Sequence, residues 1–76
     1  MADEISTLMS NSKNKSVLLK LRNKKTIKGN LLAFDVHMNL TLDDAEDVTD
    51  ENPEKLGKIL LRGDNILIVS LPDDKS

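Results

Sequence analysis

The most informative stretch of the chain is Phe34-Asp35-Val36-His37-Met38-Asn39-Leu40-Thr41-Leu42. It contains the only histidine and the only aromatic residue of the protein. Apolar and polar residues alternate along it, as they do in a β-strand with one face toward a core. The pattern predicts one face that carries a carboxylate, an imidazole and a carboxamide, and an opposite apolar face formed by Phe34, Val36, Met38, Leu40 and Leu42.

The residues on either side predict a short helix followed by five strands. Residues 3–11 carry a single apolar stripe with acidic residues at its start, which is typical of a short helix. The predicted strands cover residues 16–22, 26–35, 38–48, 57–62 and 65–71. Short connections favour antiparallel neighbours, and Gly29 inside the second strand favours a sharp bend that curls the sheet toward a small barrel. The continuous apolar run 66–69 predicts a strand covered on both faces.

Length and composition predict one domain that needs support from other copies. The 76 residues contain no cysteine and 1% aromatic residues. A chain of this size buries only about 60% of its unfolded surface, so its own core is marginal. We therefore expect a single domain over residues 1–76, with a frayed tail at 72–76, that forms an oligomer.

The charge and hydropathy of the chain limit its partners. A net charge of −2 and a pI near 5.2 argue against a protein that coats nucleic acid through overall charge, but they allow a local basic site. No apolar run approaches the roughly 20 residues of a membrane span. The acidic start of the chain has no long apolar segment typical of secretion. We expect no membrane contact and a cytoplasmic location.

Two polar clusters are candidates for a binding site. His37 could stack on a base and Asn39 could pair with a base edge, a combination that suits single-stranded RNA. Arg62 could stack on a base and offset phosphate charge, while Gly63 would allow a close backbone approach. The simpler alternative is that these are solvated side chains at strand ends. Asp64 could orient Asn39 or Arg62 through hydrogen bonds. Asp35 could orient His37 in the same way or could simply be solvated.

Other kinds of site find little support. The acidic residues between 43 and 51 lack the glycine and the ligand spacing of a calcium loop, so we expect no metal. A catalytic triad would need a serine placed near His37, and no nucleophile elbow is present. We therefore predict neither a cofactor nor an enzymatic activity.

These residues carry a resemblance to a known family. The run Lys28–Glu46, with Asp-Val-His-Met-Asn-Leu at its centre, resembles the first signature of the Sm and Sm-like (Lsm) family. The run Ile59–Ile66, with Arg-Gly-Asp-Asn, resembles the second signature, and the match is closest to the archaeal Sm-like proteins. The resemblance implies the Sm fold, which is a helix on a strongly bent five-stranded antiparallel sheet. It also implies a ring, usually a homoheptamer, closed by pairing between the fourth strand of one subunit and the fifth of the next.

The resemblance also implies a function in RNA processing or ribonucleoprotein assembly. Uridine-rich single-stranded RNA would bind at the inner rim of the ring. His37 and Arg62 would sandwich the base, and Asn39 would bond the uracil edge. Asp64 would support Asn39, and Gly63 would shape the loop. The Tyr-Lys-His type of second signature found in bacterial Hfq is absent, which places a hexamer second. The alternative function is a structural ring that binds proteins, with RNA binding incidental.

Overall fold

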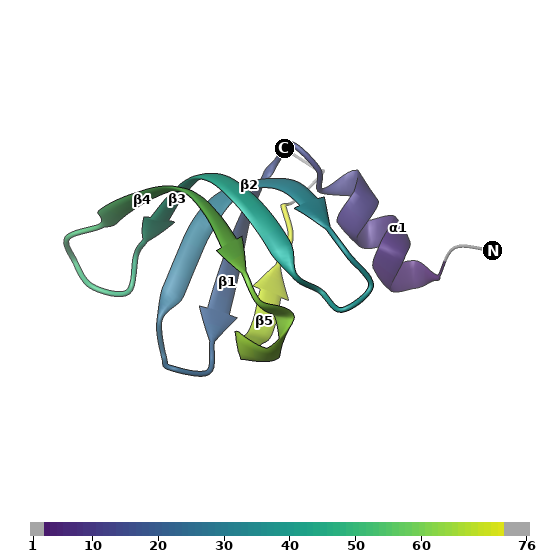
Figure 1. Cartoon of the computed structure of the whole chain (residues 1–76). Coiled ribbons are helices and arrows are strands. Elements are labelled where there is room, and N and C mark those ends of the chain that lie inside the picture. Colours follow the sequence, from purple (N-terminus) through teal and green to yellow (C-terminus); the bar gives the residue numbers. More distant parts are fainter. Residues whose placement is uncertain (1–2, 73–76) are drawn as a thin grey trace.

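The computed structural model describes residues 3–72, so most of the predicted frayed tail lies outside the described residues. A short helix precedes a single five-stranded sheet (Figure 1). The elements in chain order are α1 (Glu4–Asn11), β1 (Ser16–Leu21), β2 (Thr26–Phe34), β3 (Leu40–Asp47), β4 (Glu54–Leu61), the 3-10 helix η1 (Gly63–Asn65) and β5 (Ile66–Ser70).

The predicted helix is confirmed, and its start has a local cause. The carboxylate of Asp3 accepts a hydrogen bond of 2.7 Å from the backbone N–H of Ser6, which satisfies a donor that the first turn leaves free. Met9 is buried on the sheet, whereas Ile5 and Leu8 of the same predicted stripe remain exposed. The helix therefore covers one end of the core through a single side chain.

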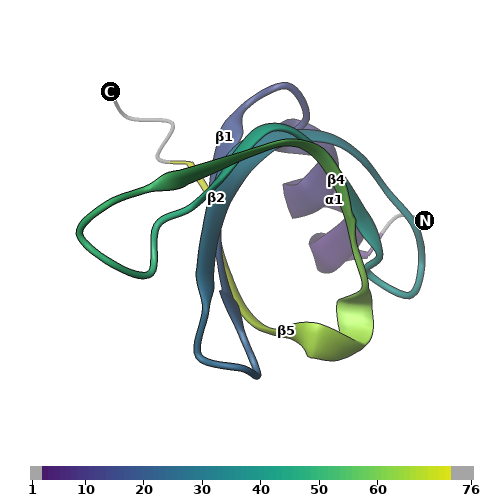
Figure 2. The same ribbon diagram turned by 60° about the vertical axis from the view of Figure 1, so that its left-hand side comes forward.

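The strands form one antiparallel sheet with the order β4-β3-β2-β1-β5. Figure 2 shows the strands curving around a common interior, with the short helix η1 joining the end of β4 to the start of β5. The prediction that all consecutive strands are neighbours is wrong for this last pair, because β4 pairs with β3 and β5 pairs with β1. Both strands are consequently edges with unpaired backbone groups.

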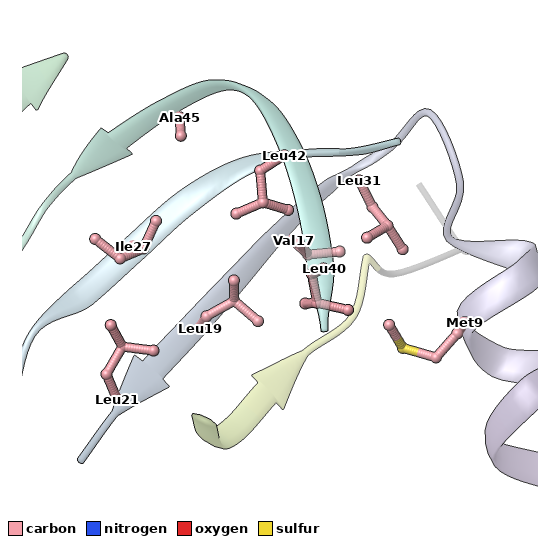
Figure 3. Close-up of a cluster of buried hydrophobic side chains, with 9 residues drawn as sticks. All are labelled: Met9, Val17, Leu19, Leu21, Ile27, Leu31, Leu40, Leu42 and Ala45. Carbon is pink, nitrogen blue, oxygen red and sulfur yellow. The ribbon is translucent and has the colours of Figure 1, made fainter. Parts of the chain in front are cut away.

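The core lies on the concave face of the three middle strands (Figure 3). Leu19, Leu31, Leu40 and Leu42 are fully buried there. Gly29 of β2 lies against β3, and a Cβ atom at this position would lie 3.2 Å from both Ala45 Cα and Leu42 Cβ. Gly29 therefore allows the close approach that the sharply curved sheet requires, as the sequence predicted.

The structure differs from the prediction at the β2–β3 turn, at the start of β4 and in the burial of β5. Residues 35–39 form a turn between β2 and β3, so the strand-like alternation breaks there and Val36 is 92% exposed instead of facing the core. β4 begins at Glu54, three residues before the predicted Gly57, which shortens the acidic loop. The β5 residues Leu67 and Ile68 are exposed, so the prediction of a strand covered on both faces is wrong for a single copy of the chain.

Candidate nucleic-acid interface

The turn between β2 and β3 is organised around the carboxylate of Asp35. One oxygen, Oδ1, accepts from the backbone N–H groups of His37 at 2.9 Å and Asn39 at 3.0 Å. The other oxygen, Oδ2, accepts from the side-chain Nδ2 of Asn39 at 3.0 Å. Met38 takes up a left-handed backbone with φ of 63° inside this turn, a conformation that is costly for a residue other than glycine. The hydrogen bonds to Asp35 thus stabilise a turn in which the backbone conformation of Met38 is unfavourable.

These hydrogen bonds stabilise the charged form of Asp35. The bond from the Asn39 side chain, followed by the one from the Asn39 backbone, lowers the pKa of Asp35 below its ordinary value of 3.8. The sequence allowed that Asp35 orients the imidazole of His37. In the structure the carboxylate bonds the backbone N–H of His37, and the ring itself is exposed on the turn.

The side chain of Asn39 is held at both ends. Its Nδ2 donates to Asp35, and its Oδ1 accepts from the backbone N–H of Gly63 at 2.8 Å. A carboxylate can only accept and a backbone N–H can only donate, so the two partners determine which end of the amide is oxygen and which is nitrogen. Asn39 therefore connects the β2–β3 turn to the β4–β5 turn, which is 24 residues further along the chain.

Gly63 makes the contact between these two turns possible. A Cβ atom on Gly63 would overlap the carbonyl oxygen of His37 and would lie 2.9 Å from two backbone atoms of Met38. Because these neighbours are backbone atoms, they cannot move aside as a flexible side chain could. The position thus requires glycine, because a larger residue has no space there. The contact also shows that the two predicted polar clusters, one with His37 and Asn39 and one with Arg62 and Gly63, lie together.

The remaining predicted residues lie next to this contact. The guanidinium of Arg62 is 3.9 Å from the carboxylate of Asp64, and both side chains are largely exposed. Such an exposed pair contributes at most about 1 kcal/mol to stability. The prediction that Asp64 supports Asn39 is wrong, because Asp35 and Gly63 supply the partners of that amide. Asp64 pairs with Arg62, which was the alternative that the sequence left open.

The sequence interpretation missed Arg22, the first residue after β1. Its backbone N–H donates to the carbonyl of Asn65 at 2.8 Å, and its Nε donates to the carbonyl of Asp64 at 2.7 Å. Arg22 therefore attaches the β1–β2 hairpin to the β4–β5 turn. No sequence pattern could indicate this role, because Arg22 and Asp64 are 42 residues apart.

The described part of the chain offers neither a metal site nor a membrane-spanning helix. Within residues 3–72, no group of three or more histidine or acidic side chains is arranged to hold a metal ion. The one α-helix described over the same range is too short and too polar to cross a membrane.

Comparison with known proteins finds close matches in sequence and in structure. The profile of the LSM domain matches residues 7–71. An snRNP Sm-like protein of Methanococcoides burtonii is 41% identical over 64 residues, which cover 83% of this chain and 89% of that protein. The P. aerophilum SmAP1 heptamer superimposes with a TM-score of 0.89 at 38% identity, over 96% of this chain and 99% of that one. The Pyrococcus abyssii Sm protein, solved with a uridine heptamer, has a TM-score of 0.82 at 33% identity, over 93% and 100% of the two chains.

Proposed function

Because the chain belongs to the LSM domain family, we propose that it assembles into a homoheptameric ring that binds uridine-rich single-stranded RNA at its inner rim. The proposed role is binding without catalysis, in RNA processing or ribonucleoprotein assembly in the cytoplasm. The observation that carries the proposal is the amide of Asn39, fixed between Asp35 and Gly63. Support for the ligand comes from the P. abyssii relative, whose structure contains a uridine heptamer.

The fixed amide accounts for a preference for uracil over cytosine. After its two bonds within the protein, Asn39 keeps one N–H and one oxygen lone pair for a ligand. Uracil offers a carbonyl acceptor beside the N3–H donor, which matches this pair. Cytosine offers an acceptor at N3 beside an amino donor. In the same position its amino group would face the N–H of Asn39 and its N3 would face the oxygen, so neither pair could form a hydrogen bond. An amide free to rotate would accept either base, and the bonds to Asp35 and Gly63 oppose that rotation.

His37 and Arg62 are proposed to hold the two faces of the base. Both side chains are exposed on turns that the Gly63 contact brings together. Stacking of a base on such side chains contributes about 1–3 kcal/mol per base. One pocket of this kind is weak, but a ring repeats the pocket in every subunit. A single RNA strand that reaches several pockets then binds strongly through its high effective concentration.

The free edges of the sheet support ring assembly. β4 and β5 lie at opposite ends of the strand order and expose Leu60, Leu67 and Ile68. Pairing of β4 of one copy with β5 of the next would satisfy both edges at once, and repeated head-to-tail contacts of this kind can close into a ring. The P. aerophilum SmAP1 relative is a heptamer.

Native mass spectrometry with matched oligonucleotides tests the proposal. We expect a heptamer that binds oligo-U more tightly than oligo-C of equal length. Asn39→Ala should weaken oligo-U binding by about tenfold or more, because each occupied pocket loses hydrogen bonds to the base edge that contribute about 1 kcal/mol each, and it should leave the number of subunits in the ring unchanged. A heptamer that ignores RNA would favour the alternative, a ring that binds proteins. A monomer would contradict the assembly itself.

A further inference from the structure

The end of the β1–β2 hairpin concentrates positive charge in an acidic protein. Four cationic side chains line a groove of about 380 Å³ there in the single chain, and Leu67 and Ile68 of the β5 edge border it. We call it the hairpin groove, and its cations are Lys20, Arg22, Lys24 and Lys25. The chain as a whole has a net charge of −2, so this concentration is local.

Most of this charge is available to a ligand. Within residues 3–72, the acidic partner found for the groove is Asp47, whose carboxylate lies 3.4 Å from the ammonium of Lys25. Arg22 uses its Nε on the Asp64 carbonyl, which leaves the donors of its two terminal amino groups. In the proposed ring another copy packs on Leu67 and Ile68 of β5, whereas Arg22 and Lys24 belong to the hairpin turn, so the inferred contact uses these two cations and not the apolar side of the groove.

Arg22 places the hairpin groove directly beside the proposed base pocket. It bonds the backbone of Asp64 and Asn65, the turn that also carries Arg62 and Gly63. The charge of Arg62 is partly offset by Asp64 at 3.9 Å. Arg22 bonds this turn through a backbone carbonyl and not through a carboxylate, so its charge is less offset than that of Arg62. A phosphate near the turn would therefore bind Arg22 more strongly than Arg62.

We propose that the hairpin groove binds the phosphates of single-stranded RNA whose bases occupy the pockets, with Arg22 as the principal contact and Lys24 as a weaker one. The inference rests on the proposed function and adds a backbone-binding site to it. Guanidinium groups suit phosphate through paired N–H donors, and Nε anchoring holds the plane of Arg22 in place for such a contact. The groove reads no sequence, so base preference remains with Asn39.

The salt dependence of binding separates a phosphate contact from a merely structural role. We would measure oligo-U affinity over a range of salt concentrations for the intact ring and for Arg22→Gln, Arg22→Lys and Lys24→Gln. The control is Lys28→Gln, which removes the same charge from the exposed middle of β2. Ring mass and thermal midpoint are checked for each variant.

Arg22→Gln should lower the magnitude of the slope of log K against log salt by about 0.7 for each phosphate that the side chain neutralises. Its preference for oligo-U over oligo-C should not change. Arg22→Lys should keep most of the slope, Lys24→Gln should lower it less than Arg22→Gln, and Lys28→Gln should match the wild type. If Arg22→Gln does not form a ring, the Lys24→Gln slope decides, and a wild-type value there overturns the inference.

Two other outcomes distinguish the inference from the function on which it rests. Weaker binding by both Arg22 variants with an unchanged slope would mean that Arg22 acts only through the β4–β5 turn, and the phosphate site would be overturned while the base pocket stands. No wild-type binding of oligo-U at low salt would overturn both proposals together.

Discussion

The middle and edge strands of the sheet are similarly apolar in sequence but differ in how the chain uses them. In β1, β2 and β3, side chains such as Leu19, Leu31 and Leu42 are fully buried against one another and the helix. In β4 and β5, Leu60 is 71% and Leu67 is 61% exposed. The difference shows that one copy of the chain completes the core but leaves both edges of the sheet unsatisfied.

The two turns that face each other between these strands add a third kind of region. They bury little apolar surface and are held instead by hydrogen bonds to Asp35 and Asn39 and by the backbone contact at Gly63. The core, the edges and the turns therefore depend on different forces, and each can be perturbed separately.

Truncation of a core leucine should have the largest effect on the single chain. Leu42→Ala removes a fully buried side chain and should lower the free energy of unfolding by about 2–5 kcal/mol. Urea unfolding followed by circular dichroism measures the change. Leu60→Ala makes the same truncation on an exposed edge and should leave the chain's own fold nearly unchanged. Equal losses for the two variants would contradict the distinction between core and edge.

A charge on the free edge should abolish assembly. Ile68→Lys places an ammonium on β5 where another copy would pack, and burying it unpaired costs several kcal/mol per interface. We expect native mass spectrometry to find no ring. Ile5→Lys changes an isoleucine of α1 that is also exposed, 63% against 55% for Ile68, and should assemble normally. An intact Ile68→Lys ring would refute the role of this edge.

A methyl group at the contact between the turns should cost about 1–3 kcal/mol, because it overlaps backbone atoms that cannot move aside. Gly63→Ala should also abolish most oligo-U binding, since the N–H of Gly63 no longer reaches Asn39. Thermal unfolding and an oligo-U titration measure the two effects. Gly57→Asn is the control: Gly57 has φ of 78°, which asparagine tolerates, and among residues 3–72 no atom other than those of its chain neighbours lies within 4 Å of its Cβ position. Wild-type binding by Gly63→Ala would separate this contact from the site.

The smallest effect expected is on acid stability. The folded-state pKa of Asp35 lies below its ordinary value of 3.8, so its bonds stabilise the turn fully above that value. This stabilisation is lost as the pH falls through the folded-state pKa. Asp3 and Asp47 have pKa values lowered in the same direction by bonds from Ser6 and Thr49. Thermal midpoints should therefore be flat near neutral pH and fall below about pH 4.

The variant Asp35→Asn measures the contribution of Asp35 to the fall in thermal midpoint at acid pH. It cannot titrate at this position, so its midpoint should fall less steeply in acid than that of the wild type. It should also bind oligo-C better relative to oligo-U, because an amide at position 35 can pair with either end of Asn39, and the N–H of Gly63 is then the one group of the two that still favours the original orientation. A wild-type acid response and an unchanged base preference would remove Asp35 from the site.

Much of the candidate site could be predicted from the sequence, but the supporting residue for Asn39 could not. His37, Asn39, Arg62 and Gly63 were predicted from residue chemistry and from the family resemblance, and the structure brings their two turns into contact. Support for Asn39 was assigned to Asp64, whereas Asp35 supplies it. Both are carboxylates on the right turns, and only the folded backbone decides which one reaches the amide.

Local patterns in the sequence determined the helix, the middle strands and the bend at Gly29, because short-range periodicity and glycine placement act within a few residues. The tertiary structure decided the rest. It interrupted the apparent alternation at Val36, placed β4 and β5 at opposite edges, and brought Arg22 to Asp64 across 42 residues. These features depend on which distant backbone groups find each other when the sheet curves. That choice is made by the packing of the whole chain, and no single stretch of sequence contains it.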